Sequence, residues 1–205
     1  MAIQKKETVQ AIMEAGKEEF LSCGYEKGSM RRIAQKASVT TGAIYGYFAS
    51  KEALFEALTG DVVYGLLDWY RQVHEEFAQL PPENQPGRLT SVVEEYIPQM
   101  IHYIYENFEA FRLFFSGGNP AVCEDFMDQL AKIEEKSSKE FLSAMKQIGK
   151  TMPEMSDTLI HILCRSFFQQ IQEFVSHEVP EEQAVHDALI LSKFQHAGWL
   201  SLIDS

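Results

Sequence analysis

Residues 29–47 contain two short helical segments separated by a turn of only three residues. The first segment carries apolar residues at helical spacing on a single face, namely Met30, Ile33, Ala34 and Ala37. Residues 38–40 form the turn, and the second segment runs to about Tyr47. Two short helices joined by so tight a turn predict a helix-turn-helix.

The whole chain is predicted to be helical, because alternating strand patterns and hairpin dipeptides are absent. We expect nine helices, three small and six longer. Their ends are marked by the caps Gly24, Ser29 and Ser50 and by breaks at residues 80–87, 116–120 and 151–155. The predicted fold is all-α, with a helix-turn-helix domain in residues 1–52 and a larger helical domain in residues 53–205.

The net charge of −12 is unevenly distributed. Residues 1–52 contain 8 Lys or Arg and 6 Asp or Glu, whereas residues 53–205 contain 10 and 24. Physiological salt screens charges over about 8 Å, so distant acidic residues interfere little with a locally basic face. The asymmetry favours nucleic-acid contact by the first quarter and a different task for the remainder.

Nothing in the sequence indicates export or membrane insertion. The start lacks a long apolar run, so no signal peptide is predicted, and no stretch reaches the roughly 18 apolar residues of a membrane span. The three cysteines, Cys23, Cys123 and Cys164, are far apart. They predict neither a disulfide framework nor a zinc site, and they favour a cytoplasmic location.

The best candidate for a metal site is Glu182 with His186, four positions apart on one predicted helix. Because a third ligand is missing nearby, we interpret these two residues as a surface pair. His161 and Cys164 are interpreted as a buried histidine beside a core thiol. No catalytic motif rises above chance, so no enzyme activity, metal or cofactor is predicted.

Residues 39–51, VTTGAIYGYFASK, combine groups that suit contact with DNA. Hydroxyl and ammonium groups for phosphates or base edges come from Thr40, Thr41, Tyr45, Tyr47 and Lys51. Gly42 permits close approach of the backbone to a partner. Phe48 is the expected inward anchor of this segment.

The stretch SMRRIAQKASVTTGAIYGYFASKEALFEAL, residues 29–58, resembles the tetracycline-repressor-like (TetR) family of bacterial transcription regulators. It follows the family pattern I-A-x-x-A-x-V-[ST]-x-G-x-[IL]-Y-x-[YH]-F-x-[SN]-K-E-x-L almost completely. The resemblance implies base-edge or phosphate contacts from Thr41, Gly42 and Ala43, phosphate contacts from Tyr45, Tyr47 and Lys51, and capping roles near the DNA backbone for Ser29 and Thr40.

Two features depart from the family pattern. Ser38 stands where the family often has glycine, so a left-handed conformation there would cost about 1 kcal/mol. Arg31 and Arg32 are more basic than the pair often found at these positions, which strengthens the expected attraction to phosphate.

Two other function classes stay open at this point. One is a helical enzyme or small-molecule carrier whose first helices are only structural, although no convergent polar set supports it. The other is an architectural DNA protein without an effector, which would be basic throughout. The alternative for Tyr45 is a partly buried side chain in place of a phosphate contact. Lys5 and Lys6 fit a solvated amino terminus better than an arm in the minor groove.

The last two predicted helices, near residues 155–177 and 181–203, are expected to build a homodimer. A single short reading helix contacts few bases, so specificity favours two copies on a palindromic operator in double-stranded DNA. The family resemblance implies a two-fold, four-helix interface. The candidate interface residues are Phe167, Ile171, Phe174, Ala188, Phe194 and Trp199. The alternative is that these faces close the core of one subunit.

A small, largely apolar or aromatic effector is expected to bind within residues 60–180 and to release DNA, since the resemblance implies repression with an effector pocket. From Met100 to Tyr105 the predicted helix is apolar or aromatic nearly all round. Pro98 cannot donate a hydrogen bond to the Glu94 carbonyl, so we expect a kink where a cavity could open. The candidate pocket residues are Tyr96, Met100, His102, Tyr103, Tyr105, Phe111, Phe114, Phe115 and Phe168. An ordinary aromatic core is the alternative.

Overall fold

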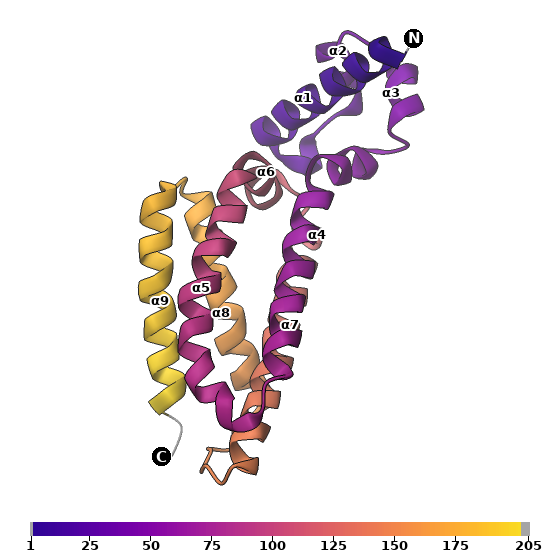
Figure 1. The fold of residues 1–205 in the computed structure, drawn as a ribbon. Coiled ribbons are helices and arrows are strands. Elements are labelled where there is room, and N and C mark those ends of the chain that lie inside the picture. The colour runs from indigo at the N-terminus through magenta and orange to yellow at the C-terminus, as the bar shows by residue number, and fades with distance from the viewer. Residues whose placement is uncertain (1, 202–205) are drawn as a thin grey trace. The chain divides into compact units, whose positions relative to one another are not determined.

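The structure is a computed structural model that describes residues 2–201, with the side chains of residues 2–4, 90, 92, 93, 199 and 200 outside the description. All regular secondary structure in the described residues is helical, which confirms the predicted all-α fold class (Figure 1). The elements are α1 (Ala2–Lys27), α2 (Met30–Lys36), α3 (Thr41–Tyr47), α4 (Lys51–Ala78), the 3-10 helix η1 (Pro82–Asn84), α5 (Gln85–Glu106), α6 (Phe108–Gly117), α7 (Pro120–Gln147), α8 (Asp157–Ser176) and α9 (Glu181–Ser201).

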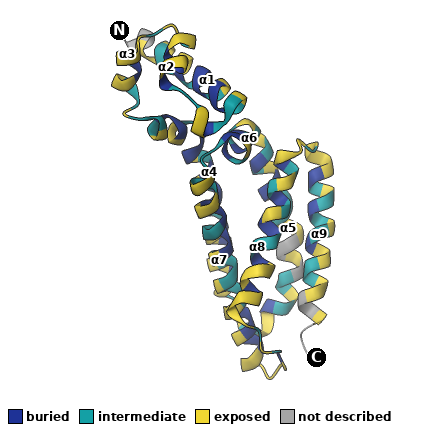
Figure 2. Ribbon diagram, turned by 180° about the vertical axis from the view of Figure 1, so that it is seen from behind, coloured by how far each residue is buried: buried dark blue, intermediate teal, exposed yellow. Residues whose placement is uncertain are grey.

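The helices form two compact units. The amino-terminal unit comprises Met1–Gly65 and Asn107–Glu124, and the second unit comprises Leu66–Glu106 and Asp125–Ser205. Helix α4 contributes residues to both. In each unit the helices turn one side inward and leave the other exposed, as amphipathic helices do (Figure 2). The functional division at residue 52 stays a prediction.

The amino-terminal unit closes around a small apolar core. Its fully buried side chains include Phe20, Ile33, Ile44 and Leu54 from α1, α2, α3 and α4. Helix α6 packs against α1 so closely that a Cβ at Gly117 would lie 2.9 Å from the Phe20 carbonyl oxygen. Glycine at residue 117 therefore permits the crossing of these two helices.

Local capping chemistry explains most helix ends in this unit. Gly24 takes a positive φ of 77°, which interrupts α1 where its end was predicted, and one further helical turn follows to Lys27. The predicted cap at Ser50 is confirmed, because its hydroxyl accepts a hydrogen bond from the Ala53 N–H at 3.1 Å. The predicted cap at Ser29 is wrong, because its side chain makes no capping bond. Its N–H instead donates to Glu19 Oε1 at 3.1 Å.

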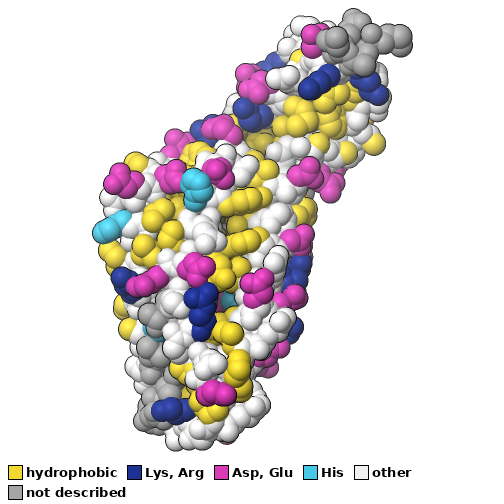
Figure 3. Space-filling model, viewed as in Figure 1, with side chains coloured by type: hydrophobic (Ala, Val, Ile, Leu, Met, Phe, Trp, Pro, Cys, Tyr) yellow, Lys and Arg dark blue, Asp and Glu magenta, His cyan; other side chains and the backbone are white. Residues whose placement is uncertain are grey.

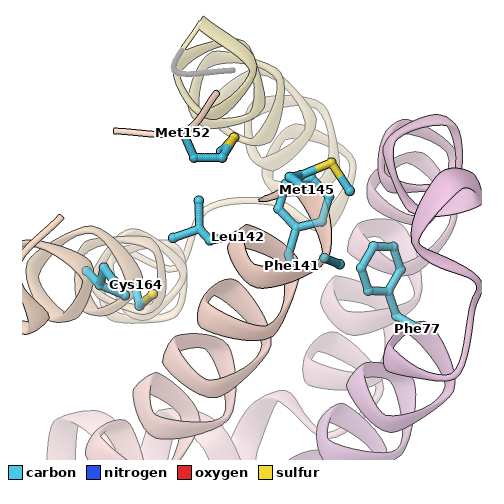
Figure 4. Close-up of a cluster of buried hydrophobic side chains, with 8 residues drawn as sticks. Phe77, Phe141, Leu142, Met145, Met152 and Cys164 are labelled. Carbon is cyan, nitrogen blue, oxygen red and sulfur yellow. The ribbon is translucent and has the colours of Figure 1, made fainter. Parts of the chain in front are cut away.

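In the second unit α5 packs closely along α9. Ala184 and Ala188 of α9 are fully buried, and their small side chains allow this approach. A separate core cluster joins α4, α7 and α8 (Figure 4). It consists of Phe77, Phe141, Leu142, Ala144, Met145, Met152, Ile160 and Cys164. In the part of the chain that the structure describes, no helix is both long and apolar enough to cross a membrane.

Candidate functional site

Helix α3 is held on the amino-terminal unit by one side and exposed on the other. Ile44 is completely buried and anchors the helix, whereas the predicted anchor Phe48 is only partly buried. Thr41 and Gly42 face solvent, and the Tyr45 side chain is 50% exposed. The predicted reading residues therefore lie on an accessible surface.

The start of α3 is fixed by its own sequence. Thr40 takes an extended conformation, and its Oγ1 accepts a hydrogen bond from the Ala43 N–H at 3.1 Å, as an N-cap does. The capping role predicted for Thr40 is thus visible at the helix itself. Ala43 is half-buried just below this cap.

The turn before α3 contains a non-glycine residue in the left-handed conformation, as considered from the sequence. Ser38 has φ of 56°, the left-handed region, where a side chain costs about 1 kcal/mol. The Val39 N–H donates to the Ala34 carbonyl at 2.9 Å across this turn. The serine at this turn position therefore adopts the glycine-like geometry and keeps the helix-turn-helix compact.

Gly42 has no packing reason to be glycine. A Cβ built there would come no nearer than 4.0 Å to another heavy atom, the Thr40 Oγ1, and its φ is not positive. Glycine inside a helix costs about 1 kcal/mol relative to alanine. The fold gains nothing from Gly42, but the same is true of Gly46, Gly87 and Gly198, so open space alone does not indicate a partner. The position of Gly42 in the exposed first turn of α3 is what favours a partner that approaches the backbone there.

A buried carboxylate, Glu19, ties α1 to α2. Its side chain is 3% exposed, and Arg32 Nε donates to Glu19 Oε1 at 2.6 Å. A second guanidinium nitrogen of Arg32 donates to the Lys27 carbonyl at 2.6 Å, and Lys36 Nζ lies 3.9 Å from Glu19 Oε2. Arg32, predicted to contact phosphate, is therefore also a structural residue.

Glu19 stays ionised despite its burial. Burial alone raises the pKa of a carboxyl group, but the hydrogen bonds from Arg32 and Ser29 outweigh this effect and hold the pKa of Glu19 below its usual value. Sequence reasoning missed this residue. Its helical spacing from Ile12 and Gly16 places it on the buried face of α1, whereas Glu18 is exposed.

Lys51 is held in place by the end of α1. Its ammonium donates to the Tyr25 carbonyl at 2.8 Å and to the Glu26 carbonyl at 3.3 Å, and it lies 4.3 Å from the centroid of the Tyr25 ring. These contacts position the cation rather than neutralise it, because none of them is with a carboxylate. Its predicted phosphate contact stays a prediction.

Arg31 is the contrasting cation of this surface. It is exposed, and its guanidinium forms no hydrogen bond or ion pair with any described residue. On the face shown in Figure 3, Lys and Arg side chains border an apolar area of the amino-terminal unit, while acidic side chains are spread over the second unit. Exposed basic groups thus lie close to α3 in this unit, although others occur on the second unit.

The nine predicted pocket residues are not brought together in one unit. Phe111, Phe114 and Phe115 belong to the amino-terminal unit, where the Phe114 ring stacks at 6.4 Å on Phe55. The six others lie in the second unit: Tyr96, Met100, His102, Tyr103, Tyr105 and Phe168. Of these, Met100 and Phe168 are buried, and Tyr103 is half-buried with a pKa raised by that burial.

Two of these six residues form hydrogen bonds with residues at or just before the start of α9. His102 is exposed, with Nδ1 at 2.8 Å from Glu181 and Nε2 at 3.2 Å from Glu106. The hydrogen bond with Glu181, assisted by the charge of Glu106, raises the pKa of His102. The Tyr105 hydroxyl donates to the Val179 carbonyl at 2.5 Å. These contacts connect α5 to α9.

The second unit contains a cavity of about 150 Å³ between helices α4, α5, α7, α8 and α9. Only Tyr96 of the predicted pocket set lines it. Its other lining residues include the predicted core thiol Cys164 and the predicted interface residue Phe167. The sequence did not single out four further lining residues, Tyr70, His74, Glu134 and Ser192. Phe168 lies behind this wall, with its ring edge-on to Tyr70 at 5.4 Å.

A hydrogen-bonded charge group lies in the wall of this cavity. Glu134 Oε2 accepts a hydrogen bond from the Tyr70 hydroxyl and lies 3.1 Å from His74 Nε2. Burial opposes the charge of Glu134, but His74 and Tyr70 more than compensate, so its pKa is lowered. Burial and Glu134 together raise the pKa of the Tyr70 hydroxyl and that of the Cys164 thiol, the latter to about 12.

The predicted interface residues fall into two groups. Phe167, Ile171 and Ala188 are buried within the single chain and Phe174 is partly buried, whereas the Phe194 side chain is 77% exposed. The Trp199 side chain lies outside the described residues. Exposed large apolar side chains on α8 and α9 are Leu159, Ile162, Leu163, Ile190 and Phe194.

No cluster of three or more potential metal ligands occurs among the described residues. His186 pairs with Asp187 at 3.0 Å, and Glu182 is exposed. His161 is exposed and pairs with Glu135 at 2.8 Å, so its predicted burial beside Cys164 is wrong. His161 lies on the solvent side of α8, where a carboxylate is available as its partner.

Residues 12–58 match the family model described as "Bacterial regulatory proteins, tetR family". Over 52 residues the chain is 40% identical to the A-factor receptor protein of Streptomyces griseus, a match that spans 25% of this chain and only 19% of that protein. Over 185 residues it is 26% identical to the HTH-type transcriptional regulator RutR of Escherichia coli, spanning 88% of this chain and 79% of RutR.

The same fold occurs in a solved structure of NalD, the secondary repressor of the MexAB-OprM multidrug efflux pump in Pseudomonas aeruginosa. The TM-score is 0.58 with 17% identity, and the alignment covers 93% of this chain and 97% of NalD. At this identity the likeness is one of fold. It extends over both units, whereas the family model covers the helix-turn-helix region.

Proposed function

We propose that this chain, whose residues 12–58 match the model of the tetR family of bacterial regulatory proteins, regulates transcription by binding double-stranded DNA through helix α3. The observation that carries this proposal is the position of Gly42, an exposed glycine in the first turn of α3. Thr41 and Ala43 flank it at the start of α3. A base edge or phosphate that approaches the α3 backbone requires a residue without a side chain, whereas packing within the protein does not require one.

Phosphate contacts come from groups around α3. The proposed donors are the hydroxyls of Tyr45, which is exposed, and Tyr47, which is half-buried, and Arg31 supplies a cation without a partner among the described residues. Lys51 is held at the end of α1, ready to reach the DNA backbone. Such contacts position a helix-turn-helix on DNA without reading sequence. Ser29 lies beside them at the start of α2.

The proposed regulator acts as a homodimer on a palindromic operator. A seven-residue reading helix spans few base pairs, so two copies on related half-sites supply the specificity. The exposed apolar side chains of α8 and α9 are suited to bury against a second copy. Phe194 is the most exposed of them and forms the centre of the proposed interface.

We further propose repression that is relieved by a small, largely apolar or aromatic effector in the cavity of the second unit. NalD, which shares the fold, is described as a repressor. Release requires the effector to favour a conformation with a lower operator affinity, and a hundredfold preference corresponds to about 2.7 kcal/mol. Helix α4 contributes to both units and is the proposed mechanical link.

The proposal is tested by fluorescence anisotropy with duplex DNA taken from upstream of the protein's own gene and a scrambled duplex of equal length. We expect tighter binding to the native duplex and a strong loss of affinity with salt. Equal affinity for both duplexes at all salt concentrations would contradict a sequence-reading regulator.

A further inference from the structure

We propose that the cavity of the second unit takes a neutral, single-ring aromatic molecule that carries one hydrogen-bonding oxygen, with Ser192 and His74 as its polar partners. This inference rests on the proposed function, because it names the class of effector for the same cavity. It adds the size, the charge and the hydrogen-bonding residues of the site.

The size of the cavity limits the ligand to about one ring. An engineered apolar cavity of about 150 Å³ in another protein accepts benzene. The cavity here has about the same volume, and an adjoining space of about 90 Å³ shares four of its lining residues, Val73, His74, Leu89 and Glu134. One six-membered ring with short substituents therefore fits.

The walls of the cavity suit an aromatic ring. Aromatic side chains line it from three helices, namely Tyr70, Tyr96 and Phe167, and aliphatic ones include Val73, Ile97 and Leu163. Such a lining with few polar groups is typical of small-molecule sites. Edge and face contacts with these side chains stabilise a bound ring.

Two polar atoms in the cavity wall lack partners. The Ser192 side chain is 5% exposed, and its hydroxyl makes no hydrogen bond to any described residue. His74 binds Glu134 through Nε2, which leaves its buried Nδ1 equally unpaired within the described part of the chain. Buried polar groups are nearly always hydrogen-bonded in native proteins. An oxygen on the ligand would form hydrogen bonds with the Ser192 hydroxyl of α9 and with His74 Nδ1 of α4.

The charges around the cavity favour a neutral ligand. Glu134 is already matched by His74 and by the Tyr70 hydroxyl, so an anionic ligand would meet a carboxylate and a cationic one would compete with His74. His196, which also lines the cavity, adds no charge at neutral pH because burial lowers its pKa. A phenol or an aryl ketone has the required neutral oxygen.

The test uses four probes that share a methyl-substituted ring: toluene, 4-methylphenol, 4-methylbenzoate and 4-methylbenzylammonium. Their affinities for the full-length protein are measured by calorimetry at pH 7. We expect 4-methylphenol to bind about tenfold or more tightly than each of the others. Equal affinities for toluene and 4-methylphenol, tighter binding of either ion, or no binding of any probe would overturn the inference.

A Ser192→Ala variant locates the site. It should bind 4-methylphenol about tenfold more weakly than the wild type and bind toluene unchanged, because only the hydroxyl is lost. Ser201→Ala is the matched control: it lies on the same helix, is exposed, and its hydroxyl bonds only to the Gly198 carbonyl. Unchanged 4-methylphenol affinity in Ser192→Ala would overturn the assigned partner.

Operator affinity, measured in parallel, separates this inference from the proposed function. Ser192-dependent binding of 4-methylphenol without operator release supports the ligand class and contradicts the effector role. Operator binding that stays intact with no probe bound at all overturns the ligand class and leaves the DNA-binding proposal standing.

Discussion

Arg32 Nε lies 2.6 Å from Glu19 Oε1, although the two residues are thirteen positions apart and the Glu19 side chain is 3% exposed. The pair joins α1 to α2, and the Ser29 N–H donates a second hydrogen bond to Glu19 Oε1 at the start of α2. Because α3 follows α2 after a short turn, this carboxylate fixes the platform on which α3 sits.

Glu19→Gln should destabilise the protein by about 1–3 kcal/mol at neutral pH, because a buried charged partner of Arg32 is lost. The pKa of Glu19 is lowered in the folded state, so its contribution is present above the unfolded value near 4.5 and disappears as the pH falls below it. Urea denaturation between pH 7 and pH 3.5 at one protein concentration measures the difference.

Glu18→Gln is the matched control for Glu19→Gln. Glu18 is 60% exposed and pairs with Lys36 at 3.7 Å, so its loss should change stability by less than about 0.5 kcal/mol. A Glu19→Gln effect that is as small, or that stays constant down to pH 3.5, would contradict the assigned role of the buried carboxylate.

Gly42→Ala should stabilise the protein by about 0.5–1 kcal/mol and weaken operator binding at the same time. The added methyl group meets open space inside the protein, but it would obstruct DNA at the α3 backbone. Gly87→Ala, in α5 and equally open, should stabilise without changing operator affinity. Thermal unfolding and anisotropy measure both effects, and unchanged operator affinity in Gly42→Ala would remove glycine 42 from the reading surface.

Arg31→Ala should weaken binding to all duplexes and reduce the slope of log affinity against log salt by about 0.9, the value for one phosphate contact. Its guanidinium has no partner among the described residues, so stability should change little. Lys146→Ala, an exposed change of equal charge in the second unit, is the control. The same slope in both variants as in the wild type would exclude Arg31 from the phosphate contacts.

The parts of this fold that the sequence predicted are local. The turn at Ser38, the N-cap at Thr40 and the helix end near Gly24 each depend on residues within a few positions of one another. Helix propensity and capping act at that range, so pattern analysis detects them. Helical spacing places Glu19 on the buried face of α1, but its partner Arg32 comes from another helix, and no local pattern identifies that pair.

The candidate cavity was beyond prediction for the same reason. Tyr70, Glu134 and Ser192 come from α4, α7 and α9, and only the packing of these helices brings them to one space. The many aromatic residues of the sequence predicted a pocket that includes Phe111 and Phe114, but these two side chains pack in the amino-terminal unit. Composition indicates that a side chain is apolar, and it does not indicate which core it enters.

Phe194→Glu should convert the proposed dimer to a monomer at micromolar concentration. Its side chain is 77% exposed in the single chain, so the change costs little within the subunit and places a charge in the interface. Ile148→Glu, at an exposed apolar position after α7, is the control and should leave the dimer intact. Sedimentation velocity reports the mass of each variant. If the Phe194→Glu variant remained a dimer, the proposed interface would be contradicted.

Selection of bound duplexes from a random-sequence library, carried out with the wild type and with Thr41→Ala, tests the central claim most directly. The account predicts that the wild type enriches a palindrome whose half-site centres lie about 10 base pairs, or a multiple of that, apart. Thr41→Ala should alter the preferred base at symmetric positions of the same palindrome. Failure of the wild type to enrich any sequence, or an identical sequence preference in both proteins, would contradict the claim that α3 reads DNA.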